Sequence, residues 1–501
     1  MSTLATAPAL EIDDLQGLIA RSYASLKHAV YVPAAFDPQN PAGARAWVSA
    51  VAATVTSASK RSAQVKEEGR ALNLAFTRSG LETLGLAPDE IATFSREFQE
   101  GMATEHRKRV LGDTEDADPG AWRWGGPTNP AIHAMLFLFA DSPERLEQIL
   151  AEERRRAAEH GVTLAEPLDS IMLAGDKEHF GFHDGIAQPR IAGMGGGEDA
   201  GAGPAIPAGE VVLGYPNAYG KLPESPTVAE TERARQILPL RPEDPDNPGA
   251  PPRRDLGRNG SYIVFRQLEQ DVRTFWRFID ERTRSGDTPD PERRKWLAAK
   301  MVGRWPNGAP LVKYPDGEPE TSDLSKANDF MYKSDLQGEK CPIGAHIRRS
   351  NPRDGMQPAP AESLLVADRH RLLRRGRAYG EPVAESFDPA DILSQPASAN
   401  GERGLHFVCF NTDIVRQFEF VQNTWVNNMK FDGLYADPDP VIAPHCDPDQ
   451  AKHPEQISSF TVQRCPVRHR ETRLPRFVTM RGGAYLFMPG MKALRYLASL
   501  A

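Results

Sequence analysis

The stretch EHFGFHDGIAQPRI, residues 178–191, is the most unusual part of this chain of 501 residues. Two histidines and an aspartate lie among glycines, which permit tight turns with positive φ close to a ligand. His179 and His183 are four residues apart, which on a helix would make a metal-binding pair, but the glycines disfavour a helix here. From these residues alone, the segment is either a polar loop around a satisfied Asp184 or a loop that lies against a ligand.

A second segment, residues 341–354, reads CPIGAHIRRSNPRD and combines one histidine with three arginines. A neutral imidazole, such as that of His346, is a standard axial ligand of haem iron. Arginine binds carboxylates with a rigid fork of donors, so Arg348 and Arg353 could pair with haem propionates. The segment could instead be a basic surface loop, or Cys341 could ligate the iron as a thiolate. Ligation by this thiol is disfavoured because a buried cysteine usually acts as a small hydrophobic residue.

Two further segments carry weaker signals. Residues 370–380 read HRLLRRGRAYG and place Arg374 and Arg375 before a glycine turn. Paired arginines are common on solvated surfaces, so this pair predicts little by itself. GLHFVCF, at residues 404–410, is a short apolar run that indicates a buried strand.

Both halves of the chain mix strand and helix patterns. Runs rich in β-branched and aromatic residues predict strands at residues 26–36, 70–77, 404–410 and 485–490. Apolar residues three and four apart predict helices at residues 88–102, 142–161, 411–425 and 491–500. Ser142 can cap the second of these helices, and Gly161 lies just past its end. Without a regular βαβ rhythm or a GxGxxG turn, the pattern favours an α+β fold over a Rossmann fold.

The chain divides at a segment of biased composition. At roughly 100–200 residues per domain, it is long enough for two to four domains. Residues 237–254 are rich in proline and charge, which predicts a linker, and the glycine-rich residues 193–210 predict a second loop. We therefore expect an N-terminal half of residues 1–236 and a C-terminal half of residues 255–501.

Charge and hydropathy disfavour several classes of protein. The net charge of −8 argues against a general nucleic-acid binder. No apolar run is long enough for a membrane span, and the N-terminus lacks both an apolar signal segment and a twin-arginine pair. The four cysteines form no CxxC pair, which disfavours a disulfide framework or a structural zinc site. We expect a cytoplasmic monomer or homo-oligomer without membrane or nucleic-acid partners.

Taken in order, these segments resemble the dye-decolourising peroxidase family. GFHDG at residues 181–185 matches the family's GxxDG signature, and the following IAQP strengthens the match. The histidine segment, the paired arginines and the apolar run match three further family segments. The resemblance also reaches both ends, through DLQGLIARSY at residues 14–23 and FVTMRGGAYLFMPGMKALRYLA at residues 477–498. It therefore covers nearly the whole chain.

The resemblance implies an α+β fold of two ferredoxin-like halves, of the dimeric α+β barrel type, with antiparallel sheets flanked by helices. The N-terminal half would carry the GxxDG loop over the distal side of a haem b held mainly by the C-terminal half. His346 would be the iron ligand, and Asp184 and Arg374 the catalytic residues of the distal side. Further residues would contact the haem: Arg348, Arg353, Leu405 and Phe407, together with Arg374.

The implied activity is reduction of hydrogen peroxide coupled to one-electron oxidation of small aromatic donors such as dyes and phenols. Asp184 would move a proton between the peroxide oxygens, and Arg374 would stabilise negative charge as the O–O bond breaks. The reference pKa of aspartate is about 3.9 and that of imidazole about 6.5, so we expect an acidic optimum. The second ring nitrogen of His346 would donate to a carboxylate, for which Asp439 and Glu419 are the candidates.

Two positions depart from the family pattern. His183 stands where arginine is frequent, and it competes with Asp184 as the acid/base. The aspartate is favoured because consecutive residues tend to point in different directions. Gly376 stands where some members carry an asparagine in the distal pocket, which leaves more of the charge stabilisation to Arg374.

Other interpretations remain open at this point. Trp425 and Tyr379 could relay electrons to large donors, although the apolar helical stripe of Trp425 favours a place in the core. The protein could also bind or handle haem without significant peroxidase turnover. A third interpretation is a non-haem metalloenzyme that uses His179 and His183.

Overall fold

The computed structural model describes residues 9–194, 205–243, 249–321, 323–357, 359–399, 401–446, 449 and 457–500. The predicted glycine-rich loop at residues 193–210 and the predicted linker at residues 237–254 lie partly outside these ranges. The chain on either side of the linker is held together, because β8 (Thr227–Ala229) pairs antiparallel with β9 (Arg253–Asp255).

Within the described residues, ten strands form one antiparallel sheet through the middle of the molecule. Its N-terminal part consists of β1 (His28–Ala35), β2 (Arg70–Phe76), β3 (Ala134–Ala140), β4 (Thr163–Leu164) and β5 (Leu168–Ser170). Its C-terminal part consists of β10 (Ser261–Gln270), β11 (Leu373–Arg374), β12 (Arg377–Tyr379), β13 (Gly404–Asn411) and β16 (Val478–Met488). The order is β11-β13-β10-β16-β2-β3-β1-β4, with β12 beside β13 and β5 beside β1.

The two parts of the sheet meet at one short contact. β16 pairs with β10 from Met488 to Val478, but it pairs with β2 only through Phe487 opposite Phe76. Each part therefore keeps its own strand ladder, and β16 joins the ladders into one sheet. This antiparallel sheet with flanking helices agrees with the predicted α+β class.

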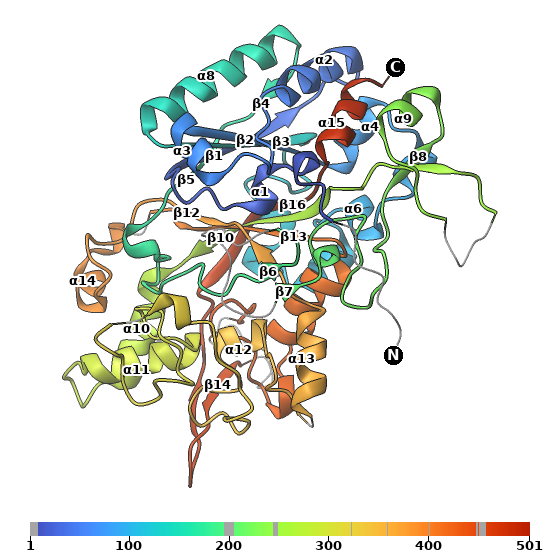
Figure 1. The fold of residues 1–501 in the computed structure, drawn as a ribbon. Coiled ribbons are helices and arrows are strands. Elements are labelled where there is room, and N and C mark those ends of the chain that lie inside the picture. Colours follow the sequence, from blue (N-terminus) through green and yellow to red (C-terminus); the bar gives the residue numbers. More distant parts are fainter. Residues whose placement is uncertain are drawn as a thin grey trace.

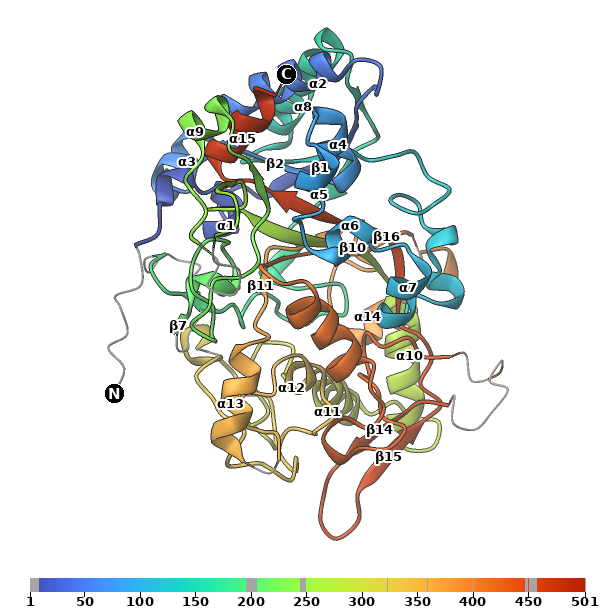
Figure 2. The same cartoon turned by 90° about the vertical axis from the view of Figure 1, so that its right-hand side faces the viewer.

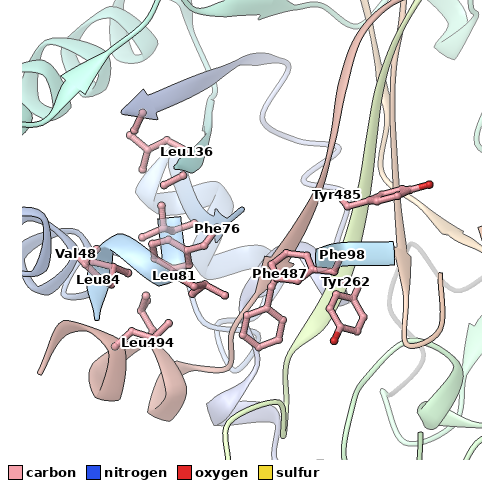
Figure 3. Packing of buried hydrophobic residues seen from close by; sticks show 14 of the residues in the cluster. Val48, Phe76, Leu81, Leu84, Phe98, Leu136, Tyr262, Tyr485, Phe487 and Leu494 are labelled. Carbon is pink, nitrogen blue, oxygen red and sulfur yellow. The ribbon is translucent and has the colours of Figure 1, made fainter. Parts of the chain in front are cut away.

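Helices cover the N-terminal part of the sheet at one end of the molecule (Figure 1). They include α2 (Pro41–Ala52), α4 (Arg78–Leu84), α8 (Pro143–Glu159) and α15 (Met491–Ala498). The last helix, α15, follows β16 and packs against α2 near the start of the chain. Figure 3 shows Val48, Leu84 and Leu494 from these helices facing one another, and all three are fully buried.

The remaining helices of the C-terminal part gather at the opposite end (Figures 1 and 2). They are α10 (Val272–Thr283), α11 (Pro291–Val302), α12 (His346–Ser350), α13 (Pro360–Asp368) and α14 (Pro389–Ser394). A hairpin of β14 (Ser459–Val462) and β15 (His469–Thr472) projects from this end (Figure 2). Shorter elements complete the fold: α1 (Gly17–Ala20), α3 (Ser62–Glu68), α7 (Glu105–Leu111), α9 (Glu232–Ile237), β6 (Arg190–Ile191) and β7 (Ala205–Ile206).

The predicted strands at residues 26–36, 70–77 and 404–410 are confirmed by β1, β2 and β13. The predicted helix at residues 142–161 is confirmed by α8, and the Ser142 hydroxyl caps it by accepting the backbone N–H of Arg145 at 3.2 Å.

Two helix predictions need correction. Residues 88–102 form two helices, α5 (Pro88–Ile91) and α6 (Arg96–Glu100): the first ends at Ile91, and Ser95 caps the second through the backbone N–H of Phe98. The helix predicted at residues 411–425 begins only at Val415, because Asn411 ends β13, and its turns at Val415–Glu419 and Val421–Val426 are wide π turns.

Candidate active site

A cavity of about 280 Å³ lies against one face of the C-terminal part of the sheet. Alternate residues of two neighbouring strands face it: Arg266, Leu268 and Gln270 of β10, and Leu405 and Phe407 of β13. Helix α12 and the loop that contains GFHDG supply other parts of the wall. The volume lies near the lower end of the range of ligand pockets, roughly 300–1,000 Å³.

The cavity brings together six of the seven residues predicted for the site. They come from the GFHDG loop, α12 and the loop after it, β11 and β13: Asp184, His346, Arg353, Arg374, Leu405 and Phe407. Polar groups with acid, base and cationic character therefore face one apolar pocket, as the sequence predicted.

Arg348, the seventh, does not line the cavity. Its guanidinium is buried and donates to the carbonyl of Cys341 at 2.8 Å and to Oδ2 of Asp335 at 3.2 Å. It also lies over the ring of Tyr332. These contacts occupy its donors, so the predicted contact of Arg348 with a cofactor is not supported, and its role here is to hold the segment before His346.

His346 begins α12, and its ring is oriented by Asp439. Nδ1 of the imidazole donates to Oδ2 of Asp439 at 2.8 Å, which leaves Nε2 as the free ring nitrogen. Asp439 is fully buried, and its Oδ1 accepts the backbone N–H groups of Val441 at 2.9 Å and Ile442 at 3.0 Å. Both oxygens of this carboxylate are therefore fixed by donors.

Charge reinforces this geometry. Burial by itself lowers the pKa of His346, but the Asp439 carboxylate outweighs burial, and the net pKa is raised. Burial likewise raises the pKa of Asp439, but the imidazole and the backbone donors outweigh it, and the net pKa is lowered. The pair thus favours an ionised carboxylate beside the imidazole.

Glu419, the other candidate partner of His346, belongs to a separate buried network. Its carboxylate accepts Nη1 of Arg107 at 2.7 Å and the hydroxyl of Tyr485 at 2.7 Å. The structure therefore selects Asp439.

Glycines and Glu178 shape the loop that carries Asp184. Gly181 and Gly185 have φ values of 95° and 79°, which other residues rarely adopt. The Glu178 carboxylate accepts backbone N–H groups two and four residues further along, at 2.9 and 3.0 Å. Asp184 is exposed at the wall of the cavity.

Arg374 is tied to this loop by the IAQP segment. Its backbone N–H donates to Oε1 of Gln188 at 3.0 Å. Among the residues that the structure describes, no hydrogen bond or ion pair engages the guanidinium of Arg374, so it is available to a ligand. Sequence reasoning did not identify Gln188 as a link, although it lies within a recognised motif.

Three arginines concentrate positive charge on the wall: Arg304 and Arg353, which are buried, and Arg371, which is partly buried. Burial lowers the pKa of both Arg304 and Arg371 to about 10, and it lowers that of Arg353. Within the described residues, Nη2 of Arg304 is buried without a hydrogen-bond partner. Such a cluster favours an anionic ligand. Sequence reasoning missed Arg304 and Arg371, because nothing in their local sequence indicates that they face the cavity.

The two histidines of the first segment do not form a metal pair. Nε2 of His179 is hydrogen-bonded to the carbonyl of Tyr379 at 2.8 Å, and Nδ1 of His183 to the carbonyl of Gly175 at 3.0 Å. Within the described ranges, no group of three His, Cys, Asp or Glu side chains is placed to hold a metal ion. The non-haem interpretation therefore has no structural support.

Burial decides the roles of Cys341 and Trp425. Cys341 is buried in an apolar cluster, and burial raises the pKa of its thiol to about 11, which disfavours a thiolate. Trp425 is buried in another cluster, edge-on to His370 and Phe420, as its helical stripe predicted.

None of the described helices has the length and apolar composition that a membrane span requires.

Comparison with known proteins assigns the family. No family model matches the chain. The multifunctional dye peroxidase of Amycolatopsis sp. is 32% identical over 438 residues, which cover 85% of this chain and 82% of the relative. The chain belongs to the dye-decolourising peroxidase family. A dye-decolorizing peroxidase of Auricularia auricula-judae is 27% identical to this chain. The match covers 97% of this chain and 87% of the relative.

Solved structures show the same fold. A decolorizing peroxidase from Auricularia auricula-judae matches this chain with a TM-score of 0.75 at 24% identity. The match covers 98% of this chain and 100% of the solved one. A DyP-type peroxidase from Anabaena sp. matches with a TM-score of 0.71 at 24% identity, over 97% and 94% of the two chains. The fold is thus α+β with two ferredoxin-like halves, and the protein is a haem peroxidase.

Proposed function

We propose that this peroxidase reduces hydrogen peroxide in the cavity and oxidises small aromatic donors in one-electron steps, with haem b held by His346. The observation that carries the proposal is the shared cavity, which the Asp439-oriented imidazole, the Asp184 carboxyl and the Arg374 guanidinium all line.

The residues present fit a haem. Nε2 of His346 is free to bind iron, and the walls supply apolar contacts through Leu405 and Phe407. Arg304 and Arg371 supply donors for the propionates, in the place first predicted for Arg348, whereas Arg353 donates to the carbonyls of Asn328 and Phe330 and adds positive charge. When bound, haem supplies an iron centre that accepts electrons from donors one at a time and passes them to peroxide.

Reduction of one peroxide needs two electrons and two protons and yields two waters. Asp184 takes a proton from one peroxide oxygen and returns it to the other, which leaves as water. Arg374 supplies positive charge where negative charge develops as the O–O bond breaks. His183 also lines the cavity, but its Nδ1 is hydrogen-bonded to the carbonyl of Gly175, and we assign the proton transfer to Asp184.

Haem handling without turnover is the weaker proposal. A storage or transfer site requires an axial ligand and propionate anchors, but it has no need of a carboxyl and an available guanidinium in the same cavity. No feature of the described residues favours it over the peroxidase function.

The test is the absorption spectrum of haem-loaded protein before and after one equivalent of hydrogen peroxide. We expect a Soret band that changes within seconds in the wild type. In Asp184→Asn the change should be slower by a factor on the order of 10²–10⁴, because proton transfer contributes about that much. Asp176→Asn is the matched control, since Asp176 is exposed on the same loop but does not line the cavity. A Soret band indifferent to peroxide would leave haem handling as the function.

A further inference from the structure

The cavity contains a second carboxyl that the proposed proton transfer does not use. Glu178 lies six residues before Asp184 and lines the same cavity. Its Oε2 accepts the backbone N–H of Phe180 at 2.9 Å and Nε2 of Gln270 at 2.6 Å, and its Oε1 accepts the backbone N–H of Phe182 at 3.0 Å. Glu178 therefore connects the Asp184 loop to β10 of the sheet.

Gln270 leaves one strong acceptor without a partner among the described residues. Its Oε1 is buried and makes no hydrogen bond there, although its Nε2 donates to Glu178. A carboxamide can exchange the positions of its oxygen and nitrogen by rotating about its last bond. In one orientation the amide donates to an ionised Glu178, and in the other its oxygen accepts the proton of a neutral Glu178. The pair can thus keep one hydrogen bond in either protonation state.

The charges around Glu178 leave it without a cation partner. Within the described ranges it forms no salt bridge, and the charged groups of this segment that interact with it are Lys177 and Asp184. Arg266, on β10, is engaged by both oxygens of Asp113. Arg403, whose charge acts on the neighbouring His179, donates to the carbonyls of Gly401 and Ala399. Helix α10 contributes the uncharged ring of Phe275, which packs against Phe180 in the same loop as Glu178.

We propose that Glu178 and Gln270 form a proton-holding pair that fixes the loop of Asp184 and sets the charge beside it. Glu178 is then a positioning residue for the peroxide chemistry, so this inference rests on the proposed function. Burial and, to a lesser extent, the charge of Asp184 raise the pKa of Glu178, the three donors oppose them, and the net pKa is about 7. Below neutral pH the Glu178 carboxyl is neutral and adds no negative charge to this loop segment of the cavity wall.

Ionisation of Glu178 has a direct chemical consequence. It places a second negative charge beside the atoms on which negative charge develops as peroxide is deprotonated and cleaved. Such a charge opposes the reaction, because the site stabilises developing negative charge through Arg374. The rate constant for reaction with peroxide should therefore fall as the pH rises through the pKa of Glu178.

Infrared difference spectroscopy of the haem-loaded protein between pH about 5 and pH about 9 tests the proton directly. We expect the carbonyl band of a protonated carboxyl to disappear with a midpoint near pH 7, as the pKa of Glu178 requires. The band should be absent in Glu178→Gln and present in Asp184→Asn. Gln270→Leu should move the midpoint upward, because the amide's bond to the ionised carboxylate, which lowers the pKa of Glu178, is stronger than its bond to the neutral carboxyl. Gln267→Leu is the control, since Gln267 on the same strand bonds Trp124 instead.

The rate constant with hydrogen peroxide across the same pH range gives the second readout. It should fall above neutral pH in the wild type and stay level there in Glu178→Gln. A midpoint unmoved in Gln270→Leu, or a band that survives Glu178→Gln, would overturn the pair. If Glu178→Gln does not fold, the midpoint shift of Gln270→Leu decides the question. Wild-type protein that shows the band but never reacts with peroxide would instead refute the proposed function.

Discussion

At the residue scale, the imidazole of His346 is one member of a hydrogen-bonded pair with Asp439. Its Nδ1 is bonded to a fully buried carboxylate whose second oxygen is held by two backbone N–H groups. Because the pKa of His346 is raised and that of Asp439 is lowered, the proton between them stays on Nδ1 of the imidazole. An imidazole bonded in this way donates more electron density to a metal through its other nitrogen.

Asp439→Asn should therefore weaken electron donation by His346. We expect the protein to keep its haem, the iron reduction potential to rise, and turnover to fall by about 10–100-fold, the usual effect of removing such a partner. Spectroelectrochemical titration measures the potential. Glu419→Gln is the control, because Glu419 binds Arg107 and Tyr485 and does not contact His346. An equal shift in the control would show that the effect is structural.

Glu178 also makes stability depend on pH. Its pKa rises from 4.5 in the unfolded chain to about 7 in the folded protein, so the folded state binds the proton more tightly. The stabilisation is complete below pH 4.5 and is lost as the pH rises through about 7. Relative to the wild type, Glu178→Gln should gain about 3 kcal/mol in unfolding free energy between pH about 4 and pH about 8. Urea unfolding at both pH values measures this, and a constant difference between the proteins would contradict it.

The sequence predicts best those site residues that lie within motifs. Asp184, His346 and Arg374 each stand in a short segment with family character, and all three line the cavity. It could not choose between Asp439 and Glu419, because the choice depends on a contact between residues 93 positions apart. Arg304 lies outside any motif, and only packing brings it to the wall.

At the element scale, the close contact of two backbones explains the glycine in the arginine segment. A Cβ atom on Gly376 would lie 2.4 Å from the carbonyl oxygen of His406 and 3.3 Å from Cα of Phe407, both in β13. Gly376 connects β11 to β12, and both strands pair with β13. A larger residue here would push Arg374 or Phe407 out of the cavity wall.

Gly376→Ala should therefore destabilise the protein by about 1–3 kcal/mol, the usual cost of forcing a methyl group into a packed site. It should also slow the reaction with peroxide, because Arg374 and Phe407 flank the contact. Chemical unfolding and the peroxide rate constant are the measurements. Gly317→Ala is matched to it, since a Cβ atom there meets nothing within 4 Å. A Gly376→Ala protein as stable as this control would show that the strands separate easily.

Sequence patterns located the long elements but not their internal geometry. The period of three and four residues at 88–102 is real, yet one helix ends at Ile91 and a second begins after its cap, Ser95. The helix at 411–425 carries its apolar stripe on π turns, which a period alone does not reveal. These details depend on hydrogen bonds and on packing against the cavity, as Phe418 and Val421 both line it.

At the scale of the whole molecule, one core connects the two parts of the sheet. The same apolar cluster contains Val48 and Leu84 from the N-terminal helices, Tyr485 and Phe487 from β16, and Leu494 from α15 (Figure 3). The end of the chain thus packs against its beginning, while β16 also borders the strand β10 that faces the cavity. Loss of packing in this core should reach the haem site through β16.

Leu494→Ala tests this connection. Removal of a fully buried leucine side chain costs about 2–5 kcal/mol. If the core couples the two parts, the midpoints of thermal unfolding by far-ultraviolet circular dichroism and by loss of the Soret band should fall together. Leu365→Ala, at an exposed leucine of α13, should leave both midpoints within the range of an ordinary surface change, about 0.5 kcal/mol. In Leu494→Ala, the Soret midpoint could instead equal that of the wild type while the circular-dichroism midpoint falls. That result would mean that the part around the haem unfolds independently. In that case the proposed halves, residues 1–236 and 255–501, would behave as separate folding units despite their shared sheet.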